Sequence, residues 1–210
     1  MKTKRPMIKE TVGALYLAFN TPTENGEFDG KSSSYEETNK SEVVKNIKTT
    51  ENAETTKVRA SGKDYLTANQ SASVEMAVEV VAFDPSDLAK MRKDIVGTSG
   101  LNRSGRTGVR PYFAFGKVVK KVGGGVEYAW YPKCQLTENT DDIETSEESL
   151  SEQNDTITIT AYAYNDEGDI KTYVNSEMSN FPKGLTEEKF FTAPILTDED
   201  LAALTEVEGA

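Results

Sequence analysis

The fold is decided by residues 112–136, which read YFAFGKVVKKVGGGVEYAWYPKCQL. Val126, Tyr128 and Trp130 alternate with a second set of residues, and this period of two is typical of a β-strand. The two halves are separated by the run Gly123 to Gly125, where a turn needs the positive φ that glycine adopts readily. A phosphate-binding glycine loop would be followed by a helix, whereas a strand follows here. The stretch therefore predicts a β-hairpin.

Other stretches repeat the strand pattern. SVEMAVEVVAF (73–83) places Val74, Met76, Val78 and Val80 on one face, which predicts a strand with one buried side. DTITITAYAY (155–164) alternates in the same way and is followed by NDEGD and IKTYV (170–174), which together predict a second hairpin. Residues 42–49 and 55–60 are weaker strand candidates, and Ser61 to Asp64 read as a turn.

The period changes after residue 83. Asp84 is a suitable N-cap, Pro85 suits the first helical position, and Gly97 suits a helix terminator. Apolar residues then recur at helical spacing, at Leu88, Met91, Ile95 and Val96. This pattern predicts one flanking helix over about 85–96.

The two ends of the chain lack the pattern of a core. Residues 1–13 are basic and contain Pro6, and residues 185–210 contain Pro194, so we expect extended arms around a β core at 14–184. Thr197 followed by Asp200 is a capping-box pattern that predicts a short helix in the C-terminal arm. The expected fold is one domain over 1–210. It is mainly β, with six to eight antiparallel strands in a β-sandwich or in a sheet completed by neighbours, one flanking helix, and long loops.

Composition excludes several function classes. The formal net charge of -11 argues against general nucleic-acid binding, which depends on Lys and Arg neutralising phosphates. The chain contains no histidine, which removes the commonest general base and metal ligand. Cys134 is the only cysteine and lies outside any metal-ligand spacing, so we expect a buried thiol and no intrachain disulfide. No apolar run is long enough to span a bilayer, and we expect a soluble protein.

Charge is unevenly distributed along the chain. Residues 138–155 carry eight carboxylates, and no Lys or Arg occurs between Lys133 and Lys171. The glycine-rich loop at 98–111 carries Arg103, Arg106 and Arg110 instead. Such a loop is either a solvated connection or a segment that reaches an acidic surface of a neighbouring chain.

A set of segments in a fixed order resembles the major tail proteins of phages, the tail-tube subunits of long non-contractile tails. The resemblance covers roughly residues 10–205. The segments are ALYLAF (14–19), KVRASGKDYLTANQSASVEMAVEV (57–80), DPSDLAKMRKDIVG (84–97), the aromatic hairpin at 112–136, and NDTITITAYAYNDEGDI (154–170).

The resemblance implies a β-sandwich-like subunit of a tail-tube fold that assembles, without cofactor or catalysis, into stacked hexameric rings. The stacked rings form a hollow tube through which DNA is ejected, and the arms and long loops tie neighbouring subunits together. The implied location is the virion tail, assembled in the host cytoplasm. The implied partners are other copies of the chain and the tape-measure, tail-terminator and distal tail proteins, while DNA passes without sticking and no membrane takes part.

Within that interpretation, acidic residues are candidates for the tube lumen or for the surfaces between rings, because anionic walls repel DNA phosphates. The candidates are Glu75, Glu79, Asp141, Asp142, Glu144, Glu147 and Glu148. The alternative interpretation is that the acidic run is only a solvated outer loop or a surface between rings. Arg103, Arg106 and Arg110 are the candidates for a loop that contacts a neighbouring subunit. We also expect that removal of either arm leaves a folded monomer that does not polymerise.

Three other interpretations fit parts of the sequence. A surface or secreted β-sandwich adhesion module suits the alternating strands and acidic loops, although no export signal or disulfide supports it. A ligand-binding β-barrel would use Phe113, Phe115, Tyr128 and Trp130 as pocket walls. An enzyme with paired carboxylates is disfavoured because the acidic residues cluster in polar sequence, where nothing apolar raises a pKa.

Overall fold

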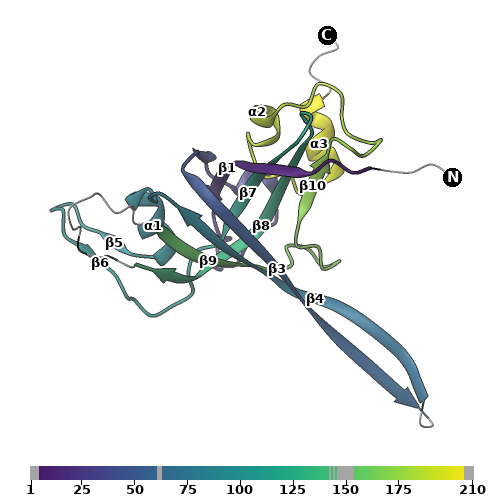
Figure 1. Cartoon of the computed structure of the whole chain (residues 1–210). Coiled ribbons are helices and arrows are strands. Elements are labelled where there is room, and N and C mark those ends of the chain that lie inside the picture. Colours follow the sequence, from purple (N-terminus) through teal and green to yellow (C-terminus); the bar gives the residue numbers. More distant parts are fainter. Residues whose placement is uncertain (1–4, 61–62, 142, 144, 146–153, 206–210) are drawn as a thin grey trace.

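The computed structural model describes residues 5–60, 63–141, 143, 145 and 154–205, with 53–60 and 63–72 described by their backbone. The protein is mainly β, as predicted: one antiparallel sheet of eight strands has the order β2-β1-β7-β8-β9-β4-β3, and β10 pairs with β8 (Figure 1). Its strands are β1 (Lys9–Phe19), β2 (Asn39–Ser41), β3 (Val44–Ala60), β4 (Lys63–Val80), β7 (Phe113–Lys121), β8 (Val126–Thr140), β9 (Asp155–Ala161) and β10 (Thr172–Asn175). A second small sheet pairs β5 (Ile95–Val96) with β6 (Asn102–Arg103).

The large sheet curls on itself. β2 and β3 stand at opposite ends of the strand order, yet only Glu42 and Val43 separate them in sequence. Across the curl, the Lys117 Nζ of β7 donates a hydrogen bond to the Thr49 Oγ1 of β3 at 2.8 Å. The inner face encloses one apolar core, to which alternate residues of five strands contribute: Leu15, Leu17, Phe19, Val74, Met76, Val78, Val80, Phe113, Phe115, Tyr131, Ile157 and Ile159. The face predicted for 74–80 is therefore confirmed as buried.

The hairpin predicted at 112–136 is confirmed as β7 and β8. Gly123 and Gly124 have φ of 92° and 86°, the conformation that the turn needs. The second predicted hairpin is wrong, because β9 and β10 do not pair with each other. β8 is long enough to take both: Thr172 to Asn175 pair with its first part, and Ala161 to Thr156 pair with its last part.

The predicted flanking helix is present but shorter, as α1 (Pro85–Arg92). Asp84 caps it as expected, accepting hydrogen bonds from the backbone N–H groups of Ser86 and Asp87 at 2.8 and 3.2 Å. The helix ends at Lys93, which takes the left-handed conformation with φ of 63°, four residues before Gly97. Ile95 and Val96 then form β5, and of the predicted apolar stripe only Met91 is fully buried.

Neither end of the chain is an arm over the range predicted. β1 begins at Lys9, and Lys9 to Val12 pair with β7, so the sheet takes in part of the expected N-terminal arm. The C-terminal segment folds as α2 (Glu187–Phe190) and α3 (Asp198–Thr205), so its described residues contain the predicted short helix, as α3, and one further helix, α2, that was not predicted. The predicted capping box is confirmed: the Asp200 N–H donates to Thr197 Oγ1 at 3.2 Å, and the Thr197 N–H donates to Asp200 Oδ2 at 2.9 Å.

The C-terminal segment covers one part of the outer face of the sheet. Leu185, Phe190, Phe191 and Ile195 are buried against Ala14, Tyr16, Ala18, Ala114, Val118, Tyr128 and Trp130. The Trp130 Nε1–H also donates to the Phe190 carbonyl at 3.2 Å. Residues 185–205 are thus part of the folded domain, and this packing argues against the expectation that their removal leaves a folded monomer. The two phenylalanines explain why, because they bury large apolar surface that no solvated arm would hide.

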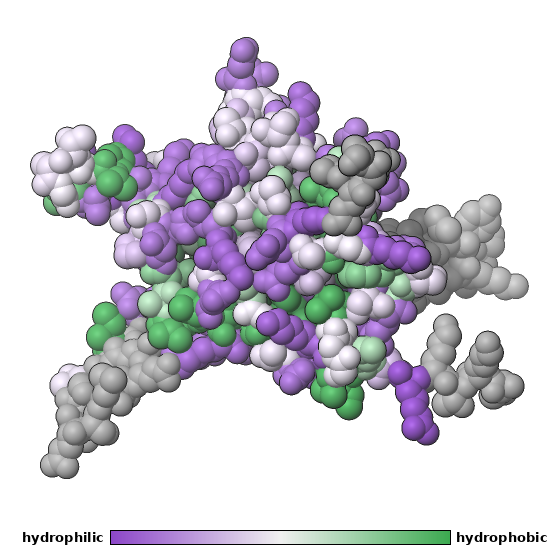
Figure 2. All heavy atoms as spheres, turned by 90° about the horizontal axis from the view of Figure 1, so that it is seen from above, coloured by the Kyte–Doolittle hydropathy of each residue, from purple (hydrophilic) through white to green (hydrophobic). Residues whose placement is uncertain are grey.

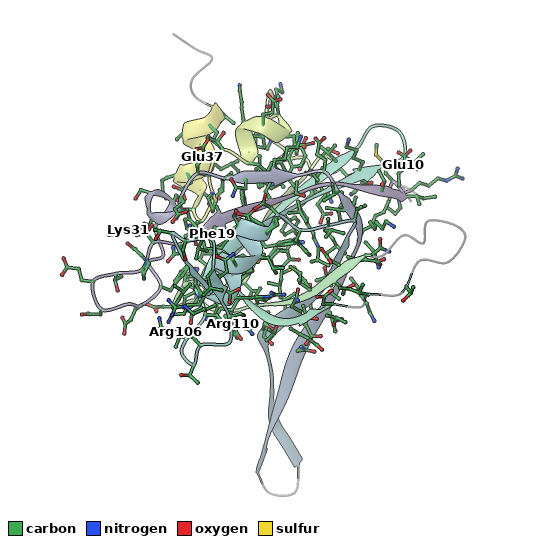
Figure 3. The ribbon with its side chains drawn as sticks, turned by 90° about the vertical axis from the view of Figure 1, so that its left-hand side faces the viewer. Glu10, Phe19, Lys31, Glu37, Arg106 and Arg110 are labelled. Atoms are coloured by element: carbon green, nitrogen blue, oxygen red, sulfur yellow. The ribbon has the colours of Figure 1, made fainter. Side chains whose placement is uncertain are left out.

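β3 and β4 form one long hairpin that projects from the body of the molecule (Figures 1 and 3). The weaker strands predicted at 42–49 and 55–60 are one continuous strand. β4 pairs with β9 only from Val74 to Val80, whereas β3 and β4 pair with each other from Val44↔Val80 out to Ala60↔Lys63. Beyond Asn52↔Ser73 the ribbon is therefore two strands wide among the described residues.

Candidate functional site

The outer face of the sheet has two unlike halves. The half built from β1, β7 and the start of β8 is covered by the C-terminal segment. The other half is built from β3, β4, β9 and the end of β8, and its side chains are polar and exposed or half-exposed. We call this second half the threonine face, defined by Thr50, Glu75, Glu79, Thr156, Thr158 and Thr160.

Two predicted candidates lie on the threonine face. Glu75 is exposed and stands opposite Thr50 on one side and Thr160 on the other. Glu79 stands opposite Thr156 and accepts a hydrogen bond from the Asn154 Nδ2 at 2.9 Å. The strand period places both carboxylates on the side opposite the core, because Val74, Met76, Val78 and Val80 fill the inner positions.

The acidic run is described only in part. Asp141 is exposed and directly follows β8, whose last residue, Thr140, lies in one cross-strand row with Thr156 and Glu79. The structure therefore brings Asp141 to the same edge of the threonine face as Glu79. The candidates Asp142, Glu144, Glu147 and Glu148 lie outside the described residues.

The threonine face has a defined chemistry. Threonine hydroxyls and carboxylate oxygens accept hydrogen bonds, and the carboxylates repel other anions. Lys48, opposite Ala77, adds a positive charge within the same surface. A surface of this kind binds water well and binds a polyphosphate poorly.

The three arginine candidates have different environments. Arg103 lies in β6 and Arg106 in the loop beyond it, and both are exposed. Arg110 is engaged within its own chain: its Nη1 donates to the carbonyls of Leu136 and Thr137, at 2.6 and 3.1 Å. These carbonyls lie at the register shift of β8 against β9, so Arg110 anchors the base of the loop. Figure 3 labels Arg106 and Arg110 and is seen from the left-hand side of Figure 1, where β5 and β6 lie.

The described residues provide neither a cluster of metal ligands nor a reactive thiol. No group of three or more His, Cys, Asp and Glu side chains among them is placed to hold a metal ion. Cys134 is fully buried as predicted, and burial raises the pKa of its thiol far above the ordinary range, so the nucleophilic thiolate is disfavoured. Among the described helices, none is long and apolar enough to cross a membrane.

The aromatic pocket considered for a ligand-binding barrel does not form. Phe113 and Phe115 face the interior core, whereas Tyr128 and Trp130 face the opposite side of the sheet and pack on the C-terminal segment. All four side chains are buried by protein. The register explains this arrangement: Trp130 stands opposite Gly116, the neighbour of Phe115, and adjacent positions of a strand point to opposite faces. The four side chains therefore make cross-strand and core contacts.

Lys117 is a feature that the sequence analysis missed. It continues the inward positions of Phe113 and Phe115, and its Nζ lies 5.3 Å from the centre of the Tyr131 ring. Burial, followed by the positive charge of Lys171, lowers the pKa of Lys117 to about 8. The signal was available in the sequence, because a lysine two positions after the second of two core phenylalanines on one strand face is placed at the inner side of the sheet, where it is half-buried.

No protein-family model matches this chain, and a comparison with curated proteins gives no significant match, so the functional assignment rests on the geometry described above.

Proposed function

We propose that this protein is the subunit of a phage tail tube, a structural protein of the virion that assembles into stacked hexameric rings around a channel for DNA. The observation that carries the proposal is the β3–β4 hairpin, which extends past its last contact with β9 as a ribbon of two strands (Figure 1). An isolated two-stranded ribbon is marginal in water. Both of its edges present backbone N–H and C=O groups to any strand or surface of a neighbouring copy.

Ring closure explains how such edges are tolerated. A head-to-tail contact between identical chains covers the exposed edge of each copy, and a closed ring stops further growth sideways. A curled sheet whose opposite parts meet across one core is compatible with the sandwich-like subunit of a tail-tube fold. The tape-measure, tail-terminator and distal tail proteins are the further partners that such a tube requires.

The threonine face supplies the proposed channel wall. Hexameric assembly would repeat Glu75 and Glu79 around the channel and expose threonine hydroxyls between them. DNA carries about one negative charge per 1.7 Å of its axis, so a wall with carboxylates and few cations lets it move without being retained. The exposed Asp141, at the same edge, extends the acidic character.

Assembly of the purified chain tests the proposal. At high concentration we expect rings and tubes in negative-stain electron microscopy, and a concentration-dependent increase in mass by light scattering. A chain that stays monomeric under these conditions contradicts the proposal and favours the surface adhesion module.

A shortened hairpin tests the role of the ribbon. Replacing residues 53–72 with Asn-Gly keeps the pairs from Val44↔Val80 to Asn52↔Ser73 and removes the projecting part. We expect this variant to retain the fluorescence of Trp130 and the circular dichroism of a folded β protein, but to form no tubes. Tubes of normal length from this variant would show that the ribbon is not an assembly element.

A further inference from the structure

One lobe of the molecule combines apolar exposure with positive charge. It consists of residues 95–109, which include β5 and β6, and we call it the tongue. Val96, Leu101 and Val109 are 67%, 66% and 69% exposed, among the highest values for large apolar residues in the described chain. Figure 2 shows apolar side chains exposed in separate groups among hydrophilic ones, one of them on the left-hand lobe, the end at which Figure 1 places β5 and β6.

The charge of the tongue has one sign. No carboxylate occurs between Asp94 and Glu127, while Arg103 and Arg106 are exposed on the tongue itself. The tongue is also a shaped element. Gly97 donates to the Leu101 carbonyl at 3.1 Å, and a side chain at Gly97 would place its Cβ 2.4 Å from that carbonyl oxygen. A tightly turned lobe of this composition fits a partner surface that combines exposed apolar side chains with acidic groups.

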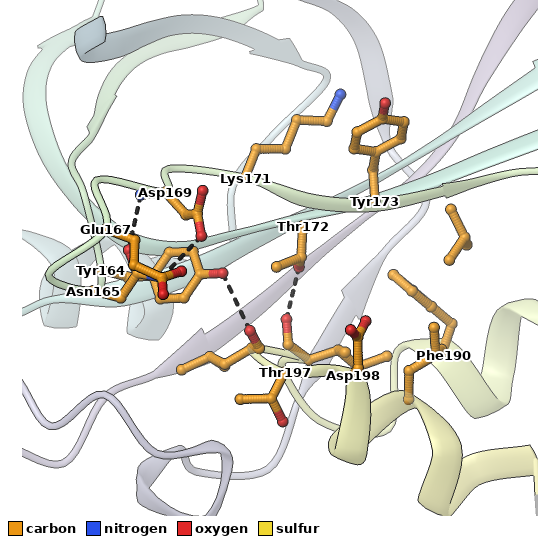
Figure 4. Close-up of a pocket in the computed structure, with 14 residues that line it drawn as sticks. Tyr164, Asn165, Glu167, Asp169, Lys171, Thr172, Tyr173, Phe190, Thr197 and Asp198 are labelled. Carbon is orange, nitrogen blue, oxygen red and sulfur yellow. Dashed lines mark hydrogen bonds between the residues drawn. The ribbon is translucent and has the colours of Figure 1, made fainter. Parts of the chain in front are cut away.

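The same chain carries a surface of that description. A groove of about 430 Å³ lies between the segment 164–174 and the segment 195–201 (Figure 4). The apolar side chains open to it are Tyr173, which is 50% exposed, and the half-buried Val174 and Leu201, whereas Phe190 and Ile195 in its lining are buried. Carboxylates of Glu167, Asp169 and Asp198 stand at its sides.

Two hydrogen bonds join the walls of the groove and fix their positions relative to each other. The Tyr164 hydroxyl donates to the Leu196 carbonyl at 3.1 Å, and the Thr172 hydroxyl donates to the Ile195 carbonyl at 2.7 Å (Figure 4). Lys171, a cation of the lining, is directed to Glu127 with an Nζ to Oε1 distance of 3.4 Å and lies over the Tyr173 ring. Acidic charge therefore dominates the rim that a ligand meets.

From these two surfaces we infer that the tongue of one copy docks into the groove of the next copy. Leu101 and Val109 would pack on Tyr173, Val174 and Leu201, and Arg103 and Arg106 would pair with Glu167 and Asp198. β5 and β6 of the tongue lie well apart from β10 and α3, which line the groove, in Figure 1, so one chain cannot join the two surfaces by itself. Contacts of this kind are heterologous and propagate from copy to copy. The inference rests on the proposed function, to which it adds the pair of surfaces that join neighbouring subunits.

Cysteine cross-linking tests the contact directly. The single native Cys134 is buried, so Leu101→Cys and Tyr173→Cys variants each present one accessible thiol. After the two are mixed and treated with a short bismaleimide, we expect a covalent dimer that neither variant forms alone. A matched mixture of Leu101→Cys with Val43→Cys, a position exposed in the connection between β2 and β3, serves as the control. Equal yields from the two mixtures would overturn the inference.

Charge reversal separates this inference from the proposed function. With either the Arg103→Glu and Arg106→Glu pair or the Glu167→Lys and Asp198→Lys pair, we expect the concentration at which tubes appear to rise by about tenfold. The four changes combined restore opposite charges and should return it to near the wild-type value, whereas the control pair Lys120→Glu and Lys183→Glu should leave it unchanged. If the wild type forms tubes and neither reversal matters, the docking model fails while the tail-tube proposal stands. If the wild type forms no tubes, the tail-tube proposal fails, and cross-linking still decides whether tongue and groove meet.

Discussion

The most decisive single change is Phe191→Ala, because it distinguishes a docked C-terminal segment from an extended arm. The Phe191 side chain is 3% exposed and stacks on Tyr16, with ring centres 3.9 Å apart and planes 1° from parallel. Its ring also lies 5.1 Å from that of Trp130, 5.7 Å from that of Tyr128 and 5.0 Å from that of Phe190.

The expected cost follows from this packing. Truncating a buried phenylalanine to alanine lowers the free energy of unfolding by about 3–5 kcal/mol. Aromatic pairs of this geometry contribute about 0.5–1.5 kcal/mol beyond burial, so we place Phe191→Ala at about 4–5 kcal/mol. Such a loss is a large share of the roughly 5–15 kcal/mol that stabilises a domain. A residue on a solvated arm would change the free energy of unfolding by only about 0.5 kcal/mol.

Urea denaturation followed by the fluorescence of Trp130 measures this cost, since Trp130 is the only tryptophan and is buried beside Phe191. The control is Tyr173→Ala, which removes an aromatic ring that is 50% exposed and should cost less than about 1 kcal/mol. A similarly small cost for Phe191→Ala, with an unchanged dependence on urea, would refute the docking of the C-terminal segment.

Three further changes test other parts of the structure. Gly116→Ala should lower the free energy of unfolding by about 1–3 kcal/mol through overpacking, because its Cβ would lie 2.7 Å from the Cε1 of Phe191; thermal denaturation measures this, and an unchanged midpoint contradicts it. Lys117 has its pKa lowered to about 8 from the usual 10.5, so between these pH values the unfolded chain binds more protons and the unfolding free energy rises with pH. The Lys117→Met variant should therefore have a free energy of unfolding about 1–2 kcal/mol higher than the wild type at pH 7, after allowance for partial solvation of the amine. This difference should shrink toward pH 10. Denaturation at both pH values measures it, and a difference that does not change with pH contradicts the prediction. Glu75→Lys combined with Glu79→Lys should leave tube formation intact but slow genome ejection and make it dependent on salt, and ejection at the wild-type rate would reject the threonine face as the channel wall.

Local structure could be predicted from the sequence because each strand, turn and helix start depends on a few neighbouring residues. The alternation of Val74 to Val80 specified a strand with one buried face, and Asp84 followed by Pro85 specified the start of α1. The glycines at 123–125 specified the turn between β7 and β8. Thr197 and Asp200 specified the capping box of α3.

Contacts distant in sequence decided the rest. β9 and β10 looked like partners because they follow one another, but the length of β8 gave each a separate partner on the same strand. The apolar stripe after Asp84 looked long enough for a helix to residue 96, but the chain turns at Lys93 and pairs Ile95 with Arg103. The C-terminal segment looked like an arm because it contains Pro194 and lacks the pattern of a core, and only the apolar outer surface of β1, β7 and β8 makes the burial of its side chains favourable.

The sequence by itself thus determined most of the long strands, the turn between β7 and β8 and the starts of α1 and α3, and it showed an acidic chain without histidine. The tertiary structure alone decided which strands pair, which half of the outer face remains polar, and that the tongue and the groove lie apart on the molecule. The physical reason is that propensity and capping act over one or two turns of chain, whereas pairing, burial and charge complementarity depend on surfaces that exist only after the chain has folded.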